Sequence, residues 1–303
     1  MYATPSLSTD MSAATHTAGR KVLIGLIGAG IQKSLSPAMH EQEAREHGLR
    51  LHYQLIDLDR TEGAGAQDLP TLLHAARVMG YAGCNVTYPC KQAVLPLLDE
   101  LSDEARAMGA VNTVVIRDGR LIGHNTDGSG WARGFTRALP GADLSRVVLL
   151  GAGGAGAAIA HAALRLGVGE LRIADPDPAR LAQLVADVNA LYGARAVAVS
   201  DLGLAMADAT GLIHATPTGM DKLPGLPLDE ALLRADLWVS EVVYFPLDTA
   251  LLKAARAKGC RVSDGGGMAV GQAVGAFELF TGLVPDATRM EAHFRALVTA
   301  AKP

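Results

Sequence analysis

VVLLGAGGAGAAIAHAALRLGVGELRIADPD, residues 147–177, is the stretch that decides the fold. Its aliphatic run stops at Gly151, and Gly153, Gly154 and Gly156 follow before an alanine-rich helical pattern. Gly151 permits a tight turn out of a strand, Gly153 leaves room for a pyrophosphate, and Gly156 lets the helix pack closely on the strand. The amides at the start of the helix then face the phosphates. This order of strand, glycine loop and helix predicts a Rossmann unit that binds a dinucleotide.

A second apolar run ends at Asp175, about 20 residues beyond the glycine loop, as the dinucleotide fingerprint requires. A carboxylate there accepts hydrogen bonds from the ribose hydroxyls of adenosine and repels a 2′-phosphate. Pro176 and Asp177 follow, so no cation comes directly after Asp175, and Arg180 lies one helical turn further on. The pattern favours NAD over NADP. The alternative role for Asp175 is to cap the helix expected to begin at Pro178.

The composition narrows the class of protein. The chain has 303 residues, of which 49% are hydrophobic and 34 are glycines, and its formal net charge is −4. This length suits one large or two ordinary domains, and the mild acidity argues against a nucleic-acid surface. The three cysteines have no metal-ligand spacing, which predicts reduced thiols and a cytoplasmic location. No metal site and no membrane segment are expected, and residues 1–19 are expected to be a disordered tail rather than a signal peptide.

Strand and helix patterns alternate along the chain, which predicts parallel sheets covered on both faces. Asp118-Gly119 between two apolar runs predicts a type I′ hairpin, and Ser102 before two acids predicts a helix N-cap. Strands are expected at 21–28, 51–58, 83–86, 147–150, 196–199, 211–214 and 237–243, and helices at 38–48, 69–79, 129–139, 248–258 and twice after residue 267.

Four polar clusters are expected where strands end, which is where open α/β sheets bind ligands. They are SLSPAMH (34–40), NVTYPCK (85–91), GAVNT (109–113) and GHNTDG (123–128). The second cluster contains Lys91 and the fourth Asp127, and an ammonium held near a carboxylate can act as general acid and base. The competing interpretations are a solvated lysine, a helix-capping aspartate, and serines and threonines that only form turns.

Six motifs occur in order between residues 22 and 300: these four, GAGGA at 151–155, and GMAVGQ at 267–272. With them the chain resembles the shikimate and quinate dehydrogenases. The resemblance implies that Lys91 and Asp127 are the catalytic pair. It implies a substrate site formed by Ser34, Ser36, Thr87, Asn112, Tyr244 and Gln272. It implies cofactor contacts from Gly151, Gly153, Gly154, Ala155, Asp175, Arg180, Thr216, Val242, Gly265 and Met268.

The resemblance also implies an α/β fold of two domains that face each other across a cleft. Residues 20–127 and 264–303 are expected to form the substrate-binding, catalytic domain, and residues 128–263 the NAD-binding Rossmann domain. The C-terminal helices are expected to return to the first domain.

Two features of the sequence indicate which branch of the family the chain resembles. Most biosynthetic members carry an Asn-Arg-Thr run that grips the 2′-phosphate, whereas this chain has Asp175-Pro176-Asp177, which resembles the NAD-dependent quinate/shikimate branch. Ser36 resembles shikimate-preferring members, since quinate users often carry threonine there. We therefore expect a monomer or homodimer that oxidises shikimate with NAD, with quinate as a second candidate substrate. The alternatives are a dehydrogenase of a related cyclic hydroxy acid such as aminoshikimate, and a non-catalytic NAD-binding sensor.

Overall fold

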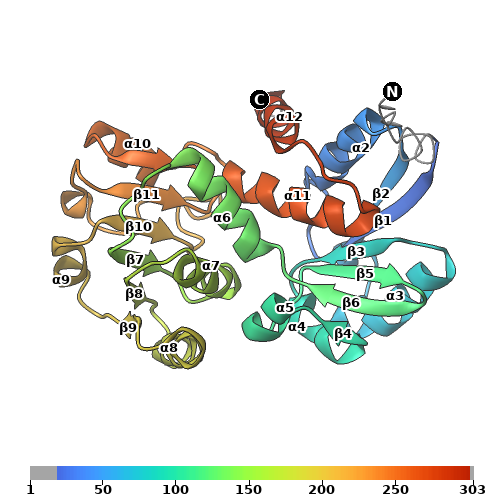
Figure 1. Ribbon diagram of the computed structural model, residues 1–303, viewed down its shortest axis with the longest axis horizontal. Helices are drawn as coiled ribbons and strands as arrows, with labels where there is room; N and C mark the ends of the chain where they lie inside the picture. The colour runs from blue at the N-terminus through green and yellow to red at the C-terminus, as the bar shows by residue number, and fades with distance from the viewer. Residues whose placement is uncertain (1–18, 301–303) are drawn as a thin grey trace, which may run out of the picture.

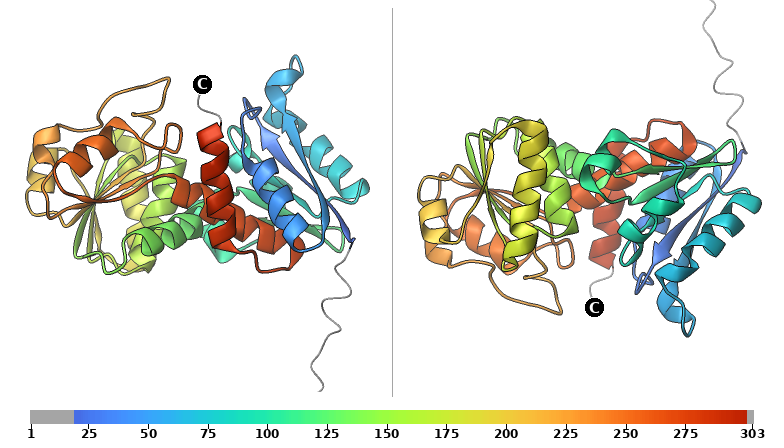
Figure 2. Two further views of the ribbon diagram at one scale, coloured as in Figure 1. Left: turned by 90° about the horizontal axis from the view of Figure 1, so that it is seen from above. Right: turned by 90° about the horizontal axis from the view of Figure 1, so that it is seen from below.

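The computed structural model describes residues 19–300, which form two sheets of six strands each (Figure 1). The views in Figure 2 place the sheets at opposite ends of the molecule, with helices α11 and α12 between them. The tail predicted for residues 1–19 lies outside the described residues except for Gly19. The helices are α2 (Ser36–Glu46), α3 (Leu69–Val78), α4 (Cys90–Ala93), α5 (Asp103–Met108), α6 (Asp127–Ala138), α7 (Gly154–Arg165), α8 (Pro178–Tyr192), α9 (Leu202–Ala207), α10 (Ala250–Ala257), α11 (Gly266–Thr281) and α12 (Ala287–Ala300).

The first sheet has the strand order β2-β1-β3-β5-β6-β4. Strands β1, β2 and β3 are parallel, whereas β5 pairs antiparallel with both β3 and β6, so the expectation of parallel sheets does not hold throughout this sheet. One of the antiparallel pairs is the predicted β5–β6 hairpin, whose turn residues Asp118 and Gly119 have φ of 52° and 77°, as a type I′ turn requires. The strands are β1 (Lys21–Gly28), β2 (Arg50–Asp57), β3 (Gly83–Val86), β4 (Glu100–Leu101), β5 (Thr113–Arg117) and β6 (Arg120–His124).

The second sheet is parallel throughout, with the order β12-β11-β10-β7-β8-β9. Successive residues of its central strand point to opposite faces, so Leu149 packs with Ile159 of α7, and Val148 packs with Met206 of α9 and Leu251 of α10. Both faces are therefore covered, as predicted. The strands are β7 (Arg146–Leu150), β8 (Glu170–Ala174), β9 (Ala196–Ala198), β10 (Gly211–His214), β11 (Trp238–Glu241) and β12 (Arg261–Ser263).

Two helix N-caps test predictions made from the sequence. Ser102 Oγ accepts a hydrogen bond from Ala105 N, which confirms the predicted N-cap of α5. At α8 the cap is Asp177, which accepts from the backbone N–H of Ala179 and Arg180. The alternative role of Asp175 as that cap is therefore wrong, and its carboxylate is left for other contacts.

Helices α6 and α11 cross with their backbones in contact. A Cβ on Gly130 would lie 2.5 Å from Gln272 N, and one on Gly134 would lie 2.5 Å from Gly267 C. Beyond this crossing, α11 inserts Phe277 into the core of the first sheet. The C-terminal helices therefore return to the first sheet, which confirms the predicted fold class.

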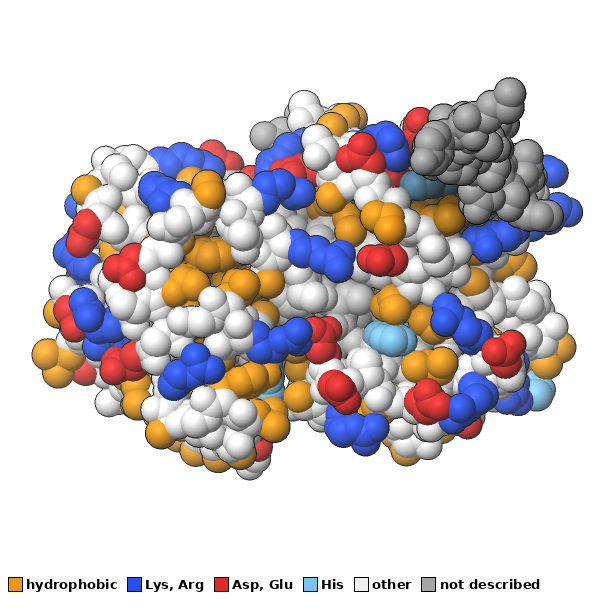
Figure 3. Space-filling model, viewed as in Figure 1, with side chains coloured by type: hydrophobic (Ala, Val, Ile, Leu, Met, Phe, Trp, Pro, Cys, Tyr) orange, Lys and Arg blue, Asp and Glu red, His pale blue; other side chains and the backbone are white. Residues whose placement is uncertain are grey.

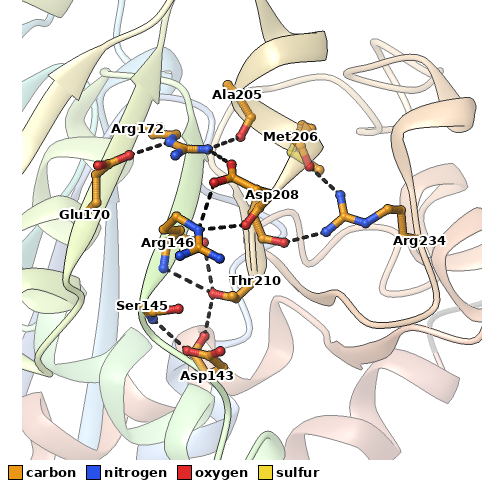
Figure 4. Close-up of polar contacts among 11 residues, drawn as sticks. Asp143, Ser145, Arg146, Glu170, Arg172, Ala205, Met206, Asp208, Thr210 and Arg234 are labelled. Carbon is orange, nitrogen blue, oxygen red and sulfur yellow. Dashed lines mark hydrogen bonds and ion pairs between the residues drawn. The ribbon is translucent and has the colours of Figure 1, made fainter.

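A network of ion pairs and hydrogen bonds lies at the N-terminal ends of the strands of the second sheet (Figure 4). Asp208, just after α9, accepts hydrogen bonds from Arg172 and pairs with Arg146. Arg234 donates to the backbone carbonyls of Met206 and Ala209 at the end of the same helix, where cations are favoured. The opposite edge, where the strands end, is the one that carries the glycine loop.

Replacing Glu43 by Gln should destabilise the protein by about 2 kcal/mol at neutral pH, because Glu43 is buried and accepts charged hydrogen bonds. Arg289 Nε donates to it at 2.9 Å and Asp286 N at 2.8 Å, which ties α12 to α2. Burial opposes ionisation, but the hydrogen bonds from Arg289, Asp286 and His47 outweigh it and hold the pKa of Glu43 below its ordinary value of 4.5.

Because the folded-state pKa is depressed, this stabilisation is present above about pH 4.5 and is lost as the pH falls further. Thermal unfolding of both proteins at a series of pH values measures the effect. The difference in Tm should shrink steadily below this pH. A difference that stays constant down to pH ~3 would show that the carboxylate charge is not responsible.

Candidate functional site

A cleft of about 770 Å³ opens where the strands of the first sheet end. It is lined by the Ser34–Ser36 loop before α2, by the turn after β3, and by Gln272 of α11. Tyr244 and Phe245, which follow β11 of the second sheet, complete the wall. Seven residues predicted from the sequence therefore line one cleft: Ser34, Ser36, Thr87, Lys91, Asn112, Tyr244 and Gln272.

The two candidate catalytic residues meet at the edge of this cleft. Lys91 comes from the short helix α4, and Asp127 is the first residue of α6. Lys91 Nζ donates to Asp127 Oδ2 at 2.5 Å. The lysine side chain is 31% exposed and the aspartate 6%, so the carboxylate is fixed in the protein while the amine faces the cleft. An ammonium and a carboxylate in this arrangement can exchange a proton with a bound hydroxyl.

Asn112 holds the other oxygen of Asp127. Its Nδ2 donates to Asp127 Oδ1 at 2.9 Å and to Thr126 Oγ1 at 3.0 Å. Its Oδ1 accepts from the backbone N–H of Thr126 at 2.9 Å. Both amide hydrogens of Asn112 therefore already have partners inside the protein.

Sequence reasoning missed His40, although it is the last residue of the SLSPAMH cluster. His40 lines the cleft, and its Nδ1 lies 2.9 Å from the carbonyl oxygen of Ser36. Burial lowers the pKa of His40 to about 4, so the ring is neutral at pH 7. Its Nε2 has no hydrogen-bond partner within residues 19–300. Since Nδ1 must be the donor to a carbonyl, Nε2 is a buried acceptor.

The glycine loop has the geometry that its sequence predicts. Gly151 has φ of 104°, and a Cβ on Gly156 would lie 2.0 Å from the carbonyl oxygen of Gly151. Cβ atoms on Gly153 and Gly154 would meet nothing within 4 Å in the described part of the chain. Helix α7 begins at Gly154 without a side-chain cap, and Ala155 follows in its first turn. The first turn of α7 therefore has uncapped backbone N–H groups that can donate hydrogen bonds to an anion.

Asp175 lies beside this loop and is held by three donors. Its Oδ2 accepts from Ala152 N at 2.7 Å, and its Oδ1 accepts from Asp177 N at 2.8 Å and from Arg180 at 2.7 Å. Burial opposes ionisation, but these hydrogen bonds outweigh it and keep the pKa of Asp175 below its usual value. The group is therefore a carboxylate at pH 7, with an exposed arginine in contact with it.

A buried His–Glu pair supports the remaining predicted cofactor residues, and sequence reasoning missed both members. His214 Nδ1 lies 2.8 Å from Glu241 Oε1, and His214 Nε2 lies 2.5 Å from Thr216 Oγ1. Glu241 Oε1 also accepts from the backbone N–H of Val242 and Val243, which ends β11 before the predicted residue 243. The signal in the sequence was a titratable residue at the end of each of two neighbouring apolar strands.

Gly265 and Met268 lie against the same segment. A Cβ on Gly265 would lie 2.5 Å from the carbonyl oxygen of Val242, so this position has no room for a side chain. Met268, at the start of α11, packs on the core that contains Ile159 and Trp131. The predicted cofactor residues therefore surround the ends of β7, β8, β10 and β11.

Three properties of the described residues bear on the class of protein. Residues 19–300 contain no group of histidine, cysteine and acidic side chains that could hold a metal ion. Over the same range, none of the helices combines the length and the apolar character that crossing a membrane requires. On the face in Figure 3, basic and acidic side chains are interspersed.

Comparisons with known proteins agree with this geometry. A family model described as the shikimate dehydrogenase substrate binding domain matches residues 26–114. The chain is 55% identical, over 92% of its length and 97% of the relative's, to a shikimate dehydrogenase (NADP(+)) of Streptomyces avermitilis. It is 50% identical to a quinate/shikimate dehydrogenase (NAD(+)) of Corynebacterium glutamicum, over 91% of this chain and 99% of that one.

A solved structure, quinate dehydrogenase from Corynebacterium glutamicum in complex with NAD, is similar to the whole molecule. It superposes with a TM-score of 0.88 at 48% identity, over 92% of this chain and all of that one. These identities and coverages show that the chain belongs to the shikimate/quinate dehydrogenase family.

Proposed function

We propose that the protein oxidises the secondary alcohol of shikimate to 3-dehydroshikimate, reversibly, with NAD as hydride acceptor. The observation that carries this proposal is the Lys91–Asp127 pair at the edge of the cleft that Ser34, Ser36 and Thr87 also line. Hydroxyls, amides and an amine around one cleft suit a small ring that carries hydroxyl groups and a carboxylate.

The candidate catalytic residues have separate roles in the proposed reaction. Oxidation of the alcohol breaks a C–H bond, whose electron pair leaves as hydride, and an O–H bond, whose proton needs a base. NAD, held at the glycine loop before α7, would supply the hydride acceptor. The neutral amine of Lys91 takes the proton, and Asp127 holds the resulting ammonium in place. In the reverse direction the ammonium returns the proton to the alkoxide oxygen.

The substrate site is proposed to use the predicted residues Ser34, Ser36, Thr87, Tyr244 and Gln272. Asn112 reaches the same cleft, but its donors already hold Asp127 and Thr126. Quinate, which has the same carboxylate on a saturated ring, is the second candidate substrate. Three relatives at 50% identity are named for both quinate and shikimate.

NAD is proposed as the cofactor because Asp175 is an ionised carboxylate at the end of β8. A 2′-phosphate beside it would meet like charge. Relatives of both cofactor types are similar to this chain, since those at 55% and 51% are named for NADP and those at 50% include enzymes named for NADP and for NAD. The ionised carboxylate of Asp175 is therefore the observation that supports NAD over NADP for this chain.

The domain boundaries form part of the proposal. Residues 20–127 and 264–303 would make up the substrate-binding domain, and residues 128–263 the NAD-binding domain. The cytoplasmic location and the monomeric or homodimeric state remain predictions from the sequence.

A steady-state assay tests the proposal. Shikimate, quinate and aminoshikimate are each offered at alkaline pH with NAD and with NADP, and reduction of the nicotinamide is followed by absorbance. We expect the highest kcat/KM with shikimate and NAD. Aminoshikimate as the best substrate would reassign the enzyme, and NAD binding without turnover on any of the acids would instead indicate a sensor.

A further inference from the structure

A chain of hydrogen bonds runs from strand β2 to Asp127 through Asn85 and Asn112, which line the cleft. Tyr53 Oη donates to Asn85 Oδ1 at 2.8 Å, and Asn85 Nδ2 donates to Thr113 Oγ1 at 2.9 Å. Thr113 Oγ1 donates to Asn112 Oδ1 at 2.9 Å, and Asn112 Nδ2 donates to Asp127 Oδ1 at 2.9 Å. In each bond the donor lies on the Tyr53 side, so the chain has a single direction and ends on the carboxylate.

Backbone groups, which cannot reverse their roles, fix this direction at two points. The N–H of Thr126 can only donate, so it holds Oδ1 of Asn112 and turns the amide NH₂ towards Asp127. The carbonyl oxygen of Asn112 can only accept, and it binds Nδ2 of Asn85 at 3.2 Å. Oδ1 of Asn85 therefore faces Tyr53. A flip of either amide would place an oxygen against an oxygen.

The chain is shielded from water along most of its length. Tyr53 is 3% exposed, Thr113 is 0% exposed and Asn112 is 4% exposed. Burial raises the pKa of the Tyr53 phenol, so its hydroxyl keeps its proton and stays a donor. Asn85 and Thr113 are directly opposite each other on β3 and β5, so the sheet itself sets their separation. Bonds in such a setting polarise one another and gain strength from the low dielectric.

We propose that Tyr53, Asn85 and Thr113 are positioning residues that act through Asn112 to fix the carboxylate of Asp127. This rests on the proposed function. With Oδ1 of Asp127 held by Asn112, the other oxygen, Oδ2, is the one that faces Lys91. Loss of the Thr113 donor leaves Oδ1 of Asn112 held by Thr126 alone, so the amide is fixed less tightly and the carboxylate spends less time aligned with the amine.

The experiment compares Thr113→Val, which keeps the shape and removes the hydroxyl, with Thr113→Ser, which keeps the hydroxyl. In the full-length protein, Thr113→Val should lower kcat by about 10-fold, the equivalent of one lost hydrogen bond. KM for shikimate and the Kd for NAD should stay near the wild-type values. Thr113→Ser should restore most of kcat, because it restores the donor to Asn112.

Two further variants keep the test independent of folding defects. Thr281→Val removes another buried threonine hydroxyl, which donates to the carbonyl of Phe277 in α11, and should leave kcat unchanged. Tyr53→Phe removes the outermost donor, which also contacts the Ser36 hydroxyl, and should lower kcat less than Thr113→Val does. The Tm of each variant is measured alongside.

The outcomes separate the two proposals. A wild-type protein without turnover on any of the acids refutes the proposed function and, with it, the role of the chain. Given an active wild type, unchanged kcat in Thr113→Val and Tyr53→Phe overturns the positioning role alone. So does a fall in kcat that Thr113→Ser shares in full, since that result would reflect packing rather than the hydroxyl.

Discussion

Lys91→Met lowers kcat by about 1,000-fold, within the range that loss of a general acid or base produces. The methionine matches the lysine in length but carries no proton, so the alcohol loses its base while Asp127 keeps its contact with Asn112. The Kd for NAD should not change, because Lys91 lies at the cleft of the first sheet and the glycine loop follows β7 of the second. Stopped-flow turnover and NAD titration measure the two quantities.

Two controls sharpen this prediction. Lys253→Met removes a lysine that is 66% exposed, beside Asp248 on the surface, and should leave kcat unchanged. Lys91→Arg keeps the positive charge but cannot release a proton near neutral pH, so it should be nearly as inactive as Lys91→Met. Full turnover in Lys91→Arg would assign the lysine a purely electrostatic role, and full turnover in Lys91→Met would refute the mechanism.

Asp175→Ala lowers kcat/KM for NAD by about 30-fold, because a charged hydrogen-bond acceptor for the ribose is lost. The same change removes the like charge that opposes a 2′-phosphate, and it frees Arg180 from its 2.7 Å contact with the carboxylate. The efficiency with NADP should therefore rise. The ratio of kcat/KM for the two cofactors, with shikimate saturating, measures the switch.

The Asp175→Ala/Arg180→Ala double variant identifies the source of any gain with NADP. If the freed arginine binds the phosphate, the double variant should lose efficiency with NAD as the single one does, without gaining efficiency with NADP. A cofactor ratio that does not move in Asp175→Ala would contradict the argument from the ribose hydroxyls.

Features of the fold that depend on neighbouring residues were predictable from the sequence. The turn at Asp118-Gly119, the cap at Ser102 and the roles of Gly151 and Gly156 each follow from local backbone geometry. The clustering of predicted substrate residues around one cleft followed from the resemblance and from the rule that ligands bind where strands end.

Contacts between distant elements were not predictable. Nothing near His214 in sequence indicates that Glu241 will lie 2.8 Å from it, because the pairing of β10 with β11 decides that distance. The resemblance implied that Asn112 binds substrate, but in the structure its side-chain amide donates hydrogen bonds to Thr126 and Asp127. Such polar partners come from strand order and register, which one sequence does not specify.

The return of α11 to the first sheet has a consequence for how the protein is made. Phe277 completes a core that begins with Val22, so a ribosome must translate the whole second sheet before the first can finish folding. Until then the apolar face of the first sheet that α11 covers is exposed, so chaperones can bind it and it can cause aggregation. A fragment that stops at residue 127 should share that exposure permanently, and supplying residues 264–303 as a separate peptide should relieve it.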